Sequence, residues 1–278
     1  MKKTAKFIKQ QFFVMLQQKG FIVSFFFMLA LMLASYINCV LSTDGVDRFQ
    51  SLHWEEMFIL REGNAASLTS IFMTAFPFVI LFPFSFSIFK DRQVQMRDIY
   101  LSRLSKRTYY VGKSVVCFLG TFLVLAIPLC IQLLMCYVTF DGGKMEQMGE
   151  VGCFSQSYIA LLQKNVEWST LFVAHPFIYY LLWILMVSFI GAVLSVAALG
   201  CSVFVKKYMV LVLLPVYLTF EILGRIEIKG NCVMNLYHQL VVSILDNNTN
   251  VKFIAGVVIV AILVAVVCLR IDSKKEIG

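Results

Sequence analysis

The chain has 278 residues and a formal net charge of +8, with 60% hydrophobic and only 14% charged residues. Its mean hydropathy is +0.82. A soluble domain carries about 25% charged residues and cannot hide this much apolar surface in one core, and a disordered chain has far fewer apolar residues, so both classes are excluded. The apolar runs are long and continuous, which favours membrane-spanning helices over the short strands of a transmembrane barrel.

Residues 3–19 predict an amphipathic helix ahead of the first membrane span. Its apolar face holds Ala5, Ile8, Phe12, Met15 and Leu16. Its polar face holds Lys2, Lys3, Lys6, Lys9, Gln10 and Gln17. Such a helix lies in the membrane interface, with its lysines toward anionic lipid headgroups. The alternative is a frayed positive tail that only sets the orientation of the chain.

Six apolar runs follow, and each is expected to cross the bilayer as a helix, because lipid offers the backbone no other hydrogen-bond partner. They lie at about 21–41, 67–89, 114–139, 177–205, 208–224 and 251–270. The stretch 177–224 is too long for one crossing, and Lys206 and Lys207 divide it in two. The sequence therefore predicts one all-α transmembrane domain, 1–278, with six transmembrane helices.

The basic residues predict the orientation of these spans. Of the 24 lysines and arginines, 17 precede the first span, join spans two and three or four and five, or follow the last span. Loops rich in Lys and Arg stay in the cytoplasm, so both termini are expected there, in agreement with an even number of spans. The positive charge is thus assigned to cytoplasmic loops rather than to a nucleic-acid partner.

The connection 90–113 between spans two and three is the most informative loop. It reads KDRQVQMRDIYLSRLSKRTYYVGK, with seven basic residues and no Pro or Gly before Gly112. This composition predicts one or two helices rather than a flexible loop. Apolar contacts are available from Val94, Ile99, Tyr100, Leu101 and Leu104. The segment is either a docking surface for a cytoplasmic partner or a solvated positive anchor.

A recognisable order of residues runs through this segment: Asp91-Arg92, a helical stretch to Leu104, Ser105-Lys106-Arg107, Tyr109 and Gly112-Lys113. Together with the amphipathic start, six spans and cytoplasmic termini, this order resembles the permease subunits of ATP-binding-cassette (ABC) transporters, in the type-2 exporter family. The resemblance covers nearly the whole chain. The chain departs from the family pattern at Gln95-Met96, where the family commonly has Gly-Thr.

The resemblance implies that 90–113 is a coupling helix that sits in a groove of a separate ATPase. It places the ATPase contact at Gln93, Val94, Met96, Arg97, Asp98, Tyr100 and Leu101. It also implies two copies of that ATPase, which bring ATP and Mg²⁺, and a second permease chain, identical or homologous, in the lipid of a bacterial plasma membrane. A hydrophobic or amphipathic cargo is expected, such as a lipid-linked molecule, a drug or an antimicrobial peptide.

The outer segment 225–250 is the second place where function is expected. Leu236, Leu240, Val241 and Ile244 alternate with polar residues and predict a short amphipathic helix. The resemblance implies a re-entrant helix capping a translocation path, and the alternative is an ordinary surface loop. Glu221, at the outer end of the fifth span, either belongs with Leu236 and Leu240 to that path or gate, or simply reaches the membrane interface.

The cysteines and the candidate enzyme motifs point to no chemistry in this chain. Cys153 and Cys232 lie in polar segments, where a disulfide between them stays open, and the other six cysteines lie in apolar runs. Gly112-Lys113-Ser114 lacks the upstream glycine of a phosphate-binding loop. Glu55-Glu56 with Arg61 does not match the E-E-x-x-x-R motif of intramembrane prenyl-protein proteases, because four residues lie between Glu56 and Arg61. The histidines at 53, 175 and 238 are too widely separated to show the spacing of a zinc site.

No catalytic residue, metal site or cofactor is therefore predicted for this chain, and ATP hydrolysis is expected in a partner. A secondary transporter and a membrane-embedded enzyme are the alternative functions. Either would need ionisable or nucleophilic groups converging inside the spans.

Overall fold

The computed structural model describes residues 2–42, 54–60, 66–140, 168, 171, 174–205, 209–225, 236–242 and 251–275, and the regular elements in these ranges are helices. The longer ones are α1 (Lys2–Leu16), α2 (Lys19–Ser42), α3 (Ala66–Leu81), α6 (Lys106–Thr139), α9 (Pro176–Cys201), α10 (Leu213–Arg225) and α12 (Val251–Lys275). The short ones are η1 (Trp54–Met57), α4 (Ser87–Gln93), α5 (Met96–Arg103), η3 (Met209–Val212) and α11 (Leu236–Leu240). The predicted all-helical fold is confirmed for these residues.

Among the described residues, four helices are long and apolar enough to cross a membrane: α2, α6, α9 and, within α12, Lys252–Asp272. The two other predicted spans are shorter than expected. α3 has 16 residues and α10 has 13, so at 1.5 Å per residue they reach about 24 and 20 Å, against a hydrocarbon core of about 30 Å. The helix lengths therefore account for four of the six predicted crossings.

The second predicted span, 67–89, breaks at a proline. Pro83 has no N–H to donate, and the turn 82–86 separates α3 from α4. Part of the helical ladder continues through the turn, because Ser85 N–H donates to the Leu81 carbonyl at 3.3 Å and Lys90 N–H to the Phe86 carbonyl at 2.9 Å. The result is a bend that lets α4 and α5 lie at the end of the bundle.

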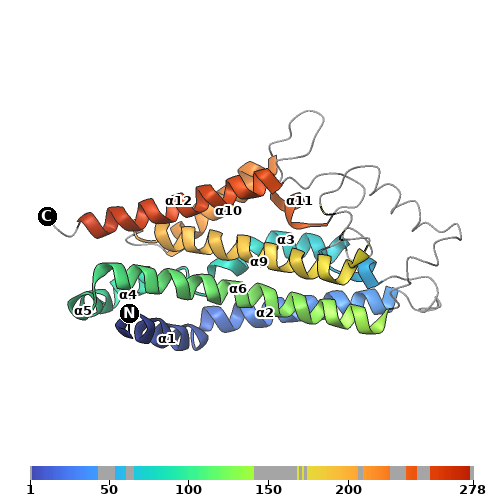
Figure 1. Ribbon diagram of the computed structural model, residues 1–278, viewed down its shortest axis with the longest axis horizontal. Coiled ribbons are helices and arrows are strands. Elements are labelled where there is room, and N and C mark those ends of the chain that lie inside the picture. The colour runs from blue at the N-terminus through green and yellow to red at the C-terminus, as the bar shows by residue number, and fades with distance from the viewer. Residues whose placement is uncertain are drawn as a thin grey trace, which may run out of the picture.

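The long helices pack in the order α2, α6, α9, α12 (Figure 1). α6 contacts both α2 and α9, α9 contacts both α6 and α12, and α3 packs against α2, α6, α9 and α10. Small residues allow the closest approaches in this bundle. A Cβ on Gly191 of α9 would lie 2.5 Å from Leu125 Cδ1 of α6, and one on Gly200 would lie 3.2 Å from the Ala265 Cα of α12.

The N-terminal helix α1 packs on α6 rather than standing apart from the bundle. Its buried residues are Phe7, Gln11 and Met15, whereas Ala5 of the predicted apolar face is exposed and Ile8, Phe12 and Leu16 are half-buried. The reason lies in α6, which presents Gly112 to the Phe7 ring and Gly120 to the Met15 sulfur. Gly112 and Gly120 are eight residues apart, as are Phe7 and Met15. The two glycines on α6 therefore determine which face of α1 is buried.

The short helix α11 closes the end of the bundle away from α5 (Figure 1). Trp183 Nε1 donates to the Leu240 carbonyl at 3.1 Å, and Val242 N–H donates to the Leu60 carbonyl at 2.6 Å. The Phe220 and Tyr237 rings lie 5.3 Å apart and join α10 to α11. These contacts make α11 part of the core at that end.

Candidate functional site at the basic end

One end of the bundle brings together α1, α4, α5, the start of α6 and the C-terminal end of α12 (Figure 1). We call it the basic end. Its basic residues include Lys6, Lys9, Lys90, Arg92, Arg97, Arg103, Lys106, Arg107, Lys113 and Arg270. Its described acidic residues are Asp91, Asp98 and Asp272. α6 has 34 residues, or about 51 Å at 1.5 Å per residue, so its first turns extend beyond a single hydrocarbon core.

The segment 90–113 folds as a helix pair followed by the start of α6. α4 ends at Gln93, and α5 begins after Gln95, which has a left-handed φ of 58°. Leu104 is extended, and the Ser105 hydroxyl oxygen caps α6 by accepting from Thr108 N–H at 3.3 Å. A left-handed φ suits glycine, so Gln95 occupies a position where Gly would carry less strain.

A buried ion pair joins α4 to α6. Lys113 Nζ lies 2.8 Å from Asp91 Oδ2, and the Tyr109 hydroxyl donates to the same oxygen at 2.8 Å. The Lys113 side chain is only 2% exposed, and its ammonium lies 5.0 Å from the centre of the Phe84 ring. Removing one member of such a pair leaves an uncompensated buried charge, at a cost of about 3–5 kcal/mol. The pair therefore holds α4 firmly against α6.

Three aromatic rings add a second connection. Phe7 of α1 lies 5.6 Å from Tyr100 of α5 and 6.2 Å from Tyr109 of α6, and Tyr100 and Tyr109 lie 6.1 Å apart. Gly112 makes room for Phe7, because a Cβ there would lie 2.6 Å from its Cδ1. Gln11 Nε2 donates to the Tyr100 hydroxyl at 3.4 Å. Phe7 and Gln11 thus connect α1 to α5.

Asp272 of α12 is the centre of a third connection. Arg97 Nη2 donates to Asp272 Oδ2 at 2.6 Å and to the Tyr110 hydroxyl at 2.7 Å, and Tyr110 donates to the same carboxylate. Arg92 Nη2 lies 3.4 Å from Asp272 Oδ1, and its Nη1 donates to the Val203 carbonyl beyond α9 at 2.6 Å. Hydrogen bonds between charged groups are stronger than those between neutral groups. They tie α4 and α5 to α6, to α12 and to the turn that follows α9.

Several residues of the sequence pattern therefore meet in one joint. Tyr109 and Lys113 both bond to Asp91, Gly112 admits Phe7, and Arg92 reaches Val203, just after α9, and Asp272 of α12. Neither Asp272 nor Tyr110 was expected from the sequence to belong to this site. The only signal for Asp272 is its place among the few acidic residues on a strongly basic side of the chain, and nothing in the sequence pairs it with Arg97, 175 residues away.

The predicted ATPase-contact residues divide into two groups. Gln93, Val94, Met96 and Asp98 are exposed. Arg97 is only 7% exposed and belongs to the joint, while Tyr100 and Leu101 are half-buried and pack against α1 and α6. Ile99, 50% exposed, joins Val94 at 68% and Met96 at 45%. We call Val94, Met96 and Ile99 the exposed apolar face; these three lie on or beside α5, at the far end of the bundle (Figure 1).

The other predicted sites lie elsewhere. Leu236 and Leu240 are fully buried core residues, and Glu221 is half-buried on α10. Cys153 and Cys232, with the disulfide left open between them, lie outside the described residues. The six described cysteines, at 39, 117, 130, 136, 201 and 268, are free thiols. Across the described ranges no group of three or more His, Cys, Asp or Glu side chains is placed to hold a metal ion.

No protein-family model matches this chain, and neither a curated protein nor a solved structure does. The fold itself shows the class: with four helices long and apolar enough to cross a bilayer, the chain is a multi-pass membrane protein. Beyond that class, the joint at the basic end and the exposed apolar face it holds are the features that a function has to explain.

Proposed function

We propose that this chain is the membrane-spanning permease subunit of an ATP-driven ABC exporter of the type-2 family, and that α4 and α5 are its coupling element. The observation that carries the proposal is the combination of an exposed apolar face, on Val94, Met96 and Ile99, with the rigid joint beneath it. Exposed apolar anchors ringed by polar residues are what a protein partner binds. A rigid attachment is what lets the movement of that partner reach the spans.

The joint indicates which helices would move when a partner displaces α5. Arg97 and Asp272 connect α5 to α12, and Asp91 and Lys113 connect α4 to α6. A displacement of α5 is therefore passed to two different long helices, which is the requirement for a motor-driven change between two arrangements of the bundle. Because basic loops stay inside, the basic end faces the cytoplasm, where an ATPase that binds ATP and Mg²⁺ is available.

The remaining parts of the proposal follow from the class of transporter. Two permease chains, identical or homologous, enclose the path and two ATPase subunits dock beneath them, in a bacterial plasma membrane. The cargo is hydrophobic or amphipathic, such as a lipid-linked molecule, a drug or an antimicrobial peptide. Glu221, Leu236 and Leu240 lie toward the outer end, where a gate would stand.

The alternative functions have less support. A secondary transporter or a membrane-embedded enzyme needs ionisable or nucleophilic groups converging inside the bundle. The described polar contacts there join uncharged hydroxyl, thiol and amide groups. Thr121 Oγ1 donates to Ser195 Oγ at 2.9 Å, Cys117 Sγ lies 3.3 Å from the same oxygen, and Gln132 Nε2 donates to Ser35 Oγ at 3.1 Å. Such bonds hold helices together and carry no charge.

Replacing Ile99 with a photo-crosslinking amino acid tests the proposal in the native membrane. The expected result is a crosslinked product containing a subunit with ABC ATPase motifs, identified by mass spectrometry, whose yield changes when ATP is added. The matched control places the same amino acid at Phe13, an exposed apolar position on α1. If Ile99 captures no ATPase, and the purified chain carries no ATP-dependent transport, the assignment to this class is wrong.

A further inference from the structure

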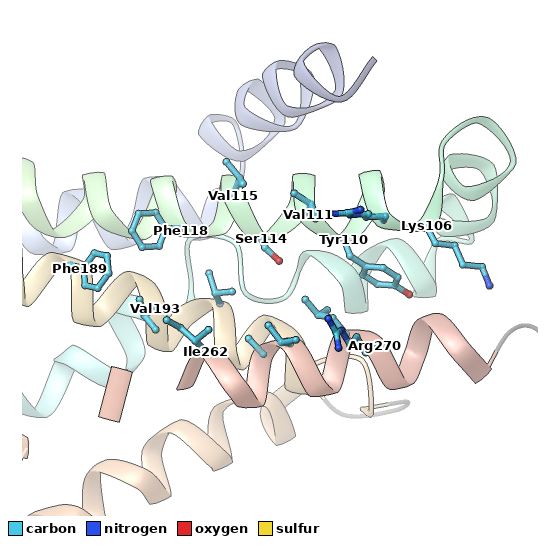
Figure 2. A pocket seen from close by; sticks show the side chains of 15 residues that line it. Lys106, Tyr110, Val111, Ser114, Val115, Phe118, Phe189, Val193, Ile262 and Arg270 are labelled. Atoms are coloured by element: carbon cyan, nitrogen blue, oxygen red, sulfur yellow. The ribbon is translucent and has the colours of Figure 1, made fainter. Parts of the chain in front are cut away.

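A large groove opens between α6, α9 and α12, beside the joint (Figure 2). Its volume is about 940 Å³. α6 contributes a single face, with positions 106, 107, 110, 111, 114, 115 and 118, and α9 and α12 supply the opposite wall. From Lys106 to Phe118 the groove runs about 18 Å along α6 at 1.5 Å per residue, close to the depth of one leaflet in a core about 30 Å thick.

The lining changes from cationic to apolar along this length. Lys106, Arg107 and Arg270 line the end nearest α5, and Phe118 and Phe189 line the opposite end (Figure 2). Between them the walls are almost wholly aliphatic. The aliphatic residues are Val111, Val115, Val193, Val196, Ile262, Ala265, Val266 and Leu269. The groove is thus complementary to a molecule with an anionic head and a hydrocarbon tail.

A polar side chain, Ser114, lies between these two ends. The Ser114 hydroxyl points into the groove (Figure 2) and is buried without a hydrogen-bond partner among the described residues. The neighbouring Tyr110 hydroxyl is already bonded to Arg97 and Asp272. A buried hydroxyl normally finds a partner, and an ester or phosphate oxygen just below an anionic headgroup would supply one.

We propose that this groove binds an anionic phospholipid of the leaflet at the basic end, with its phosphate at Lys106, Arg107 and Arg270 and one acyl chain along α6 toward Phe118. Charge complementarity selects this occupant: three basic side chains gather at the depth of the headgroups, and an apolar channel leads from them into the core. A bound lipid would fill the space between α6 and α12 and so brace the two helices that the joint connects. The proposal depends only on the membrane location of the chain and goes beyond the permease assignment.

The test measures lipid binding to the full chain, purified in detergent, by native mass spectrometry. The probes are phosphatidylglycerol and phosphatidylcholine with identical acyl chains, which differ in net charge. We expect phosphatidylglycerol to bind at least about tenfold more tightly, and the variant Arg107→Gln with Arg270→Gln to lose that preference, since each basic residue near the surface contributes to anionic-lipid attraction. The control with the same change in net charge is Lys90→Gln with Arg103→Gln, two exposed bases outside the groove.

A second pair of variants tests the tail. Val111→Trp with Val266→Trp fills the groove from two exposed positions, and it should reduce binding of both lipids, whereas Ile259→Trp, exposed on α12 outside the groove, should not. Equal binding of the two lipids, or identical losses in the groove and control variants, would overturn the proposal. So would loss of self-association in the tryptophan pair with lipid binding unchanged, because the groove would then be an interface between copies. No ATPase enters these measurements, so their failure leaves the permease proposal standing.

Discussion

Lys113 and Asp91 form a buried ion pair, Nζ to Oδ2 at 2.8 Å, between the first turns of α6 and the helix α4. Both residues belong to the sequence pattern in 90–113, and the structure brings them together. Asp91 also accepts from Tyr109, and the lysine lies among aromatic rings. The pair stiffens the attachment of α4 and α5 to the bundle, whatever binds to their exposed side.

The first prediction concerns this pair. Lys113→Met or Asp91→Asn should each destabilise the protein by about 3–5 kcal/mol, because each leaves a buried charge or donor without its partner. The double variant Lys113→Met with Asp91→Asn should recover part of the loss, since both charges are then gone. Thermal unfolding of the detergent-solubilised chain measures all three. Additive single and double effects would contradict a direct interaction.

The second prediction concerns the connection from α5 to α12. Asp272→Asn should weaken the bonds to Arg97, Arg92 and Tyr110, and charge-assisted bonds contribute about 1.5–3 kcal/mol each. We therefore expect the backbone amides of α5 to exchange hydrogen at least about tenfold faster. Hydrogen-exchange mass spectrometry measures this directly. Asp98→Asn, at an exposed position of the same helix, is the control and should leave exchange unchanged.

The third prediction compares two glycines of α6. Gly→Ala in a helix interior gains up to about 1 kcal/mol of propensity, but a Cβ at Gly112 would lie 2.6 Å from the Phe7 ring, which Tyr100 and Tyr109 hold in place. At Gly120 the neighbour is the flexible Met15 side chain, which can move. Gly112→Ala should therefore release α1 to protease digestion while Gly120→Ala does not, and Phe7→Leu should rescue Gly112→Ala. Equal protection of α1 in both glycine variants would refute this packing.

The fourth prediction concerns the turn between α4 and α5. Gln95 has a φ of 58°, a conformation that costs non-glycine residues roughly 1–2 kcal/mol. Gln95→Gly should leave stability unchanged or raise it by up to about 1 kcal/mol, whereas the β-branched Gln95→Val should lower it by more. The melting temperatures of the two variants, compared with that of the unmodified chain, test this prediction. A valine variant as stable as the unmodified chain would show that the turn has another conformation.

The fifth prediction tests the exposed apolar face. Val94→Asp with Ile99→Asp should reduce the amount of ATPase that co-purifies with the chain by at least about tenfold, because the centre of an interface tolerates charge poorly. Folding should be unaffected, since both side chains are at least half exposed. Phe13→Asp, an exposed apolar residue on α1, is the control. Undiminished co-purification of the ATPase would place the docking surface elsewhere.

The class of fold and the place of the candidate site could both be predicted from the sequence, because each depends on local composition. Long apolar runs become helices in a membrane, and a basic segment without glycine or proline becomes a short helix pair. The face that each short helix buries could not be predicted in this way. α5 has only eight residues, too few turns for a pattern to distinguish the side toward the bundle, and so Arg97 was expected at the partner surface although it lies in the joint.

By itself the sequence determined that this is a helical membrane protein with a strongly basic end, because apolar content and charge placement are properties of single residues and short runs. Only the tertiary structure decided that Asp272 meets Arg97, that Gly112 admits Phe7, and that α6, α9 and α12 enclose a groove with a cationic mouth. The physical reason is that these are contacts between residues far apart in the chain, and their partners depend on how whole helices pack.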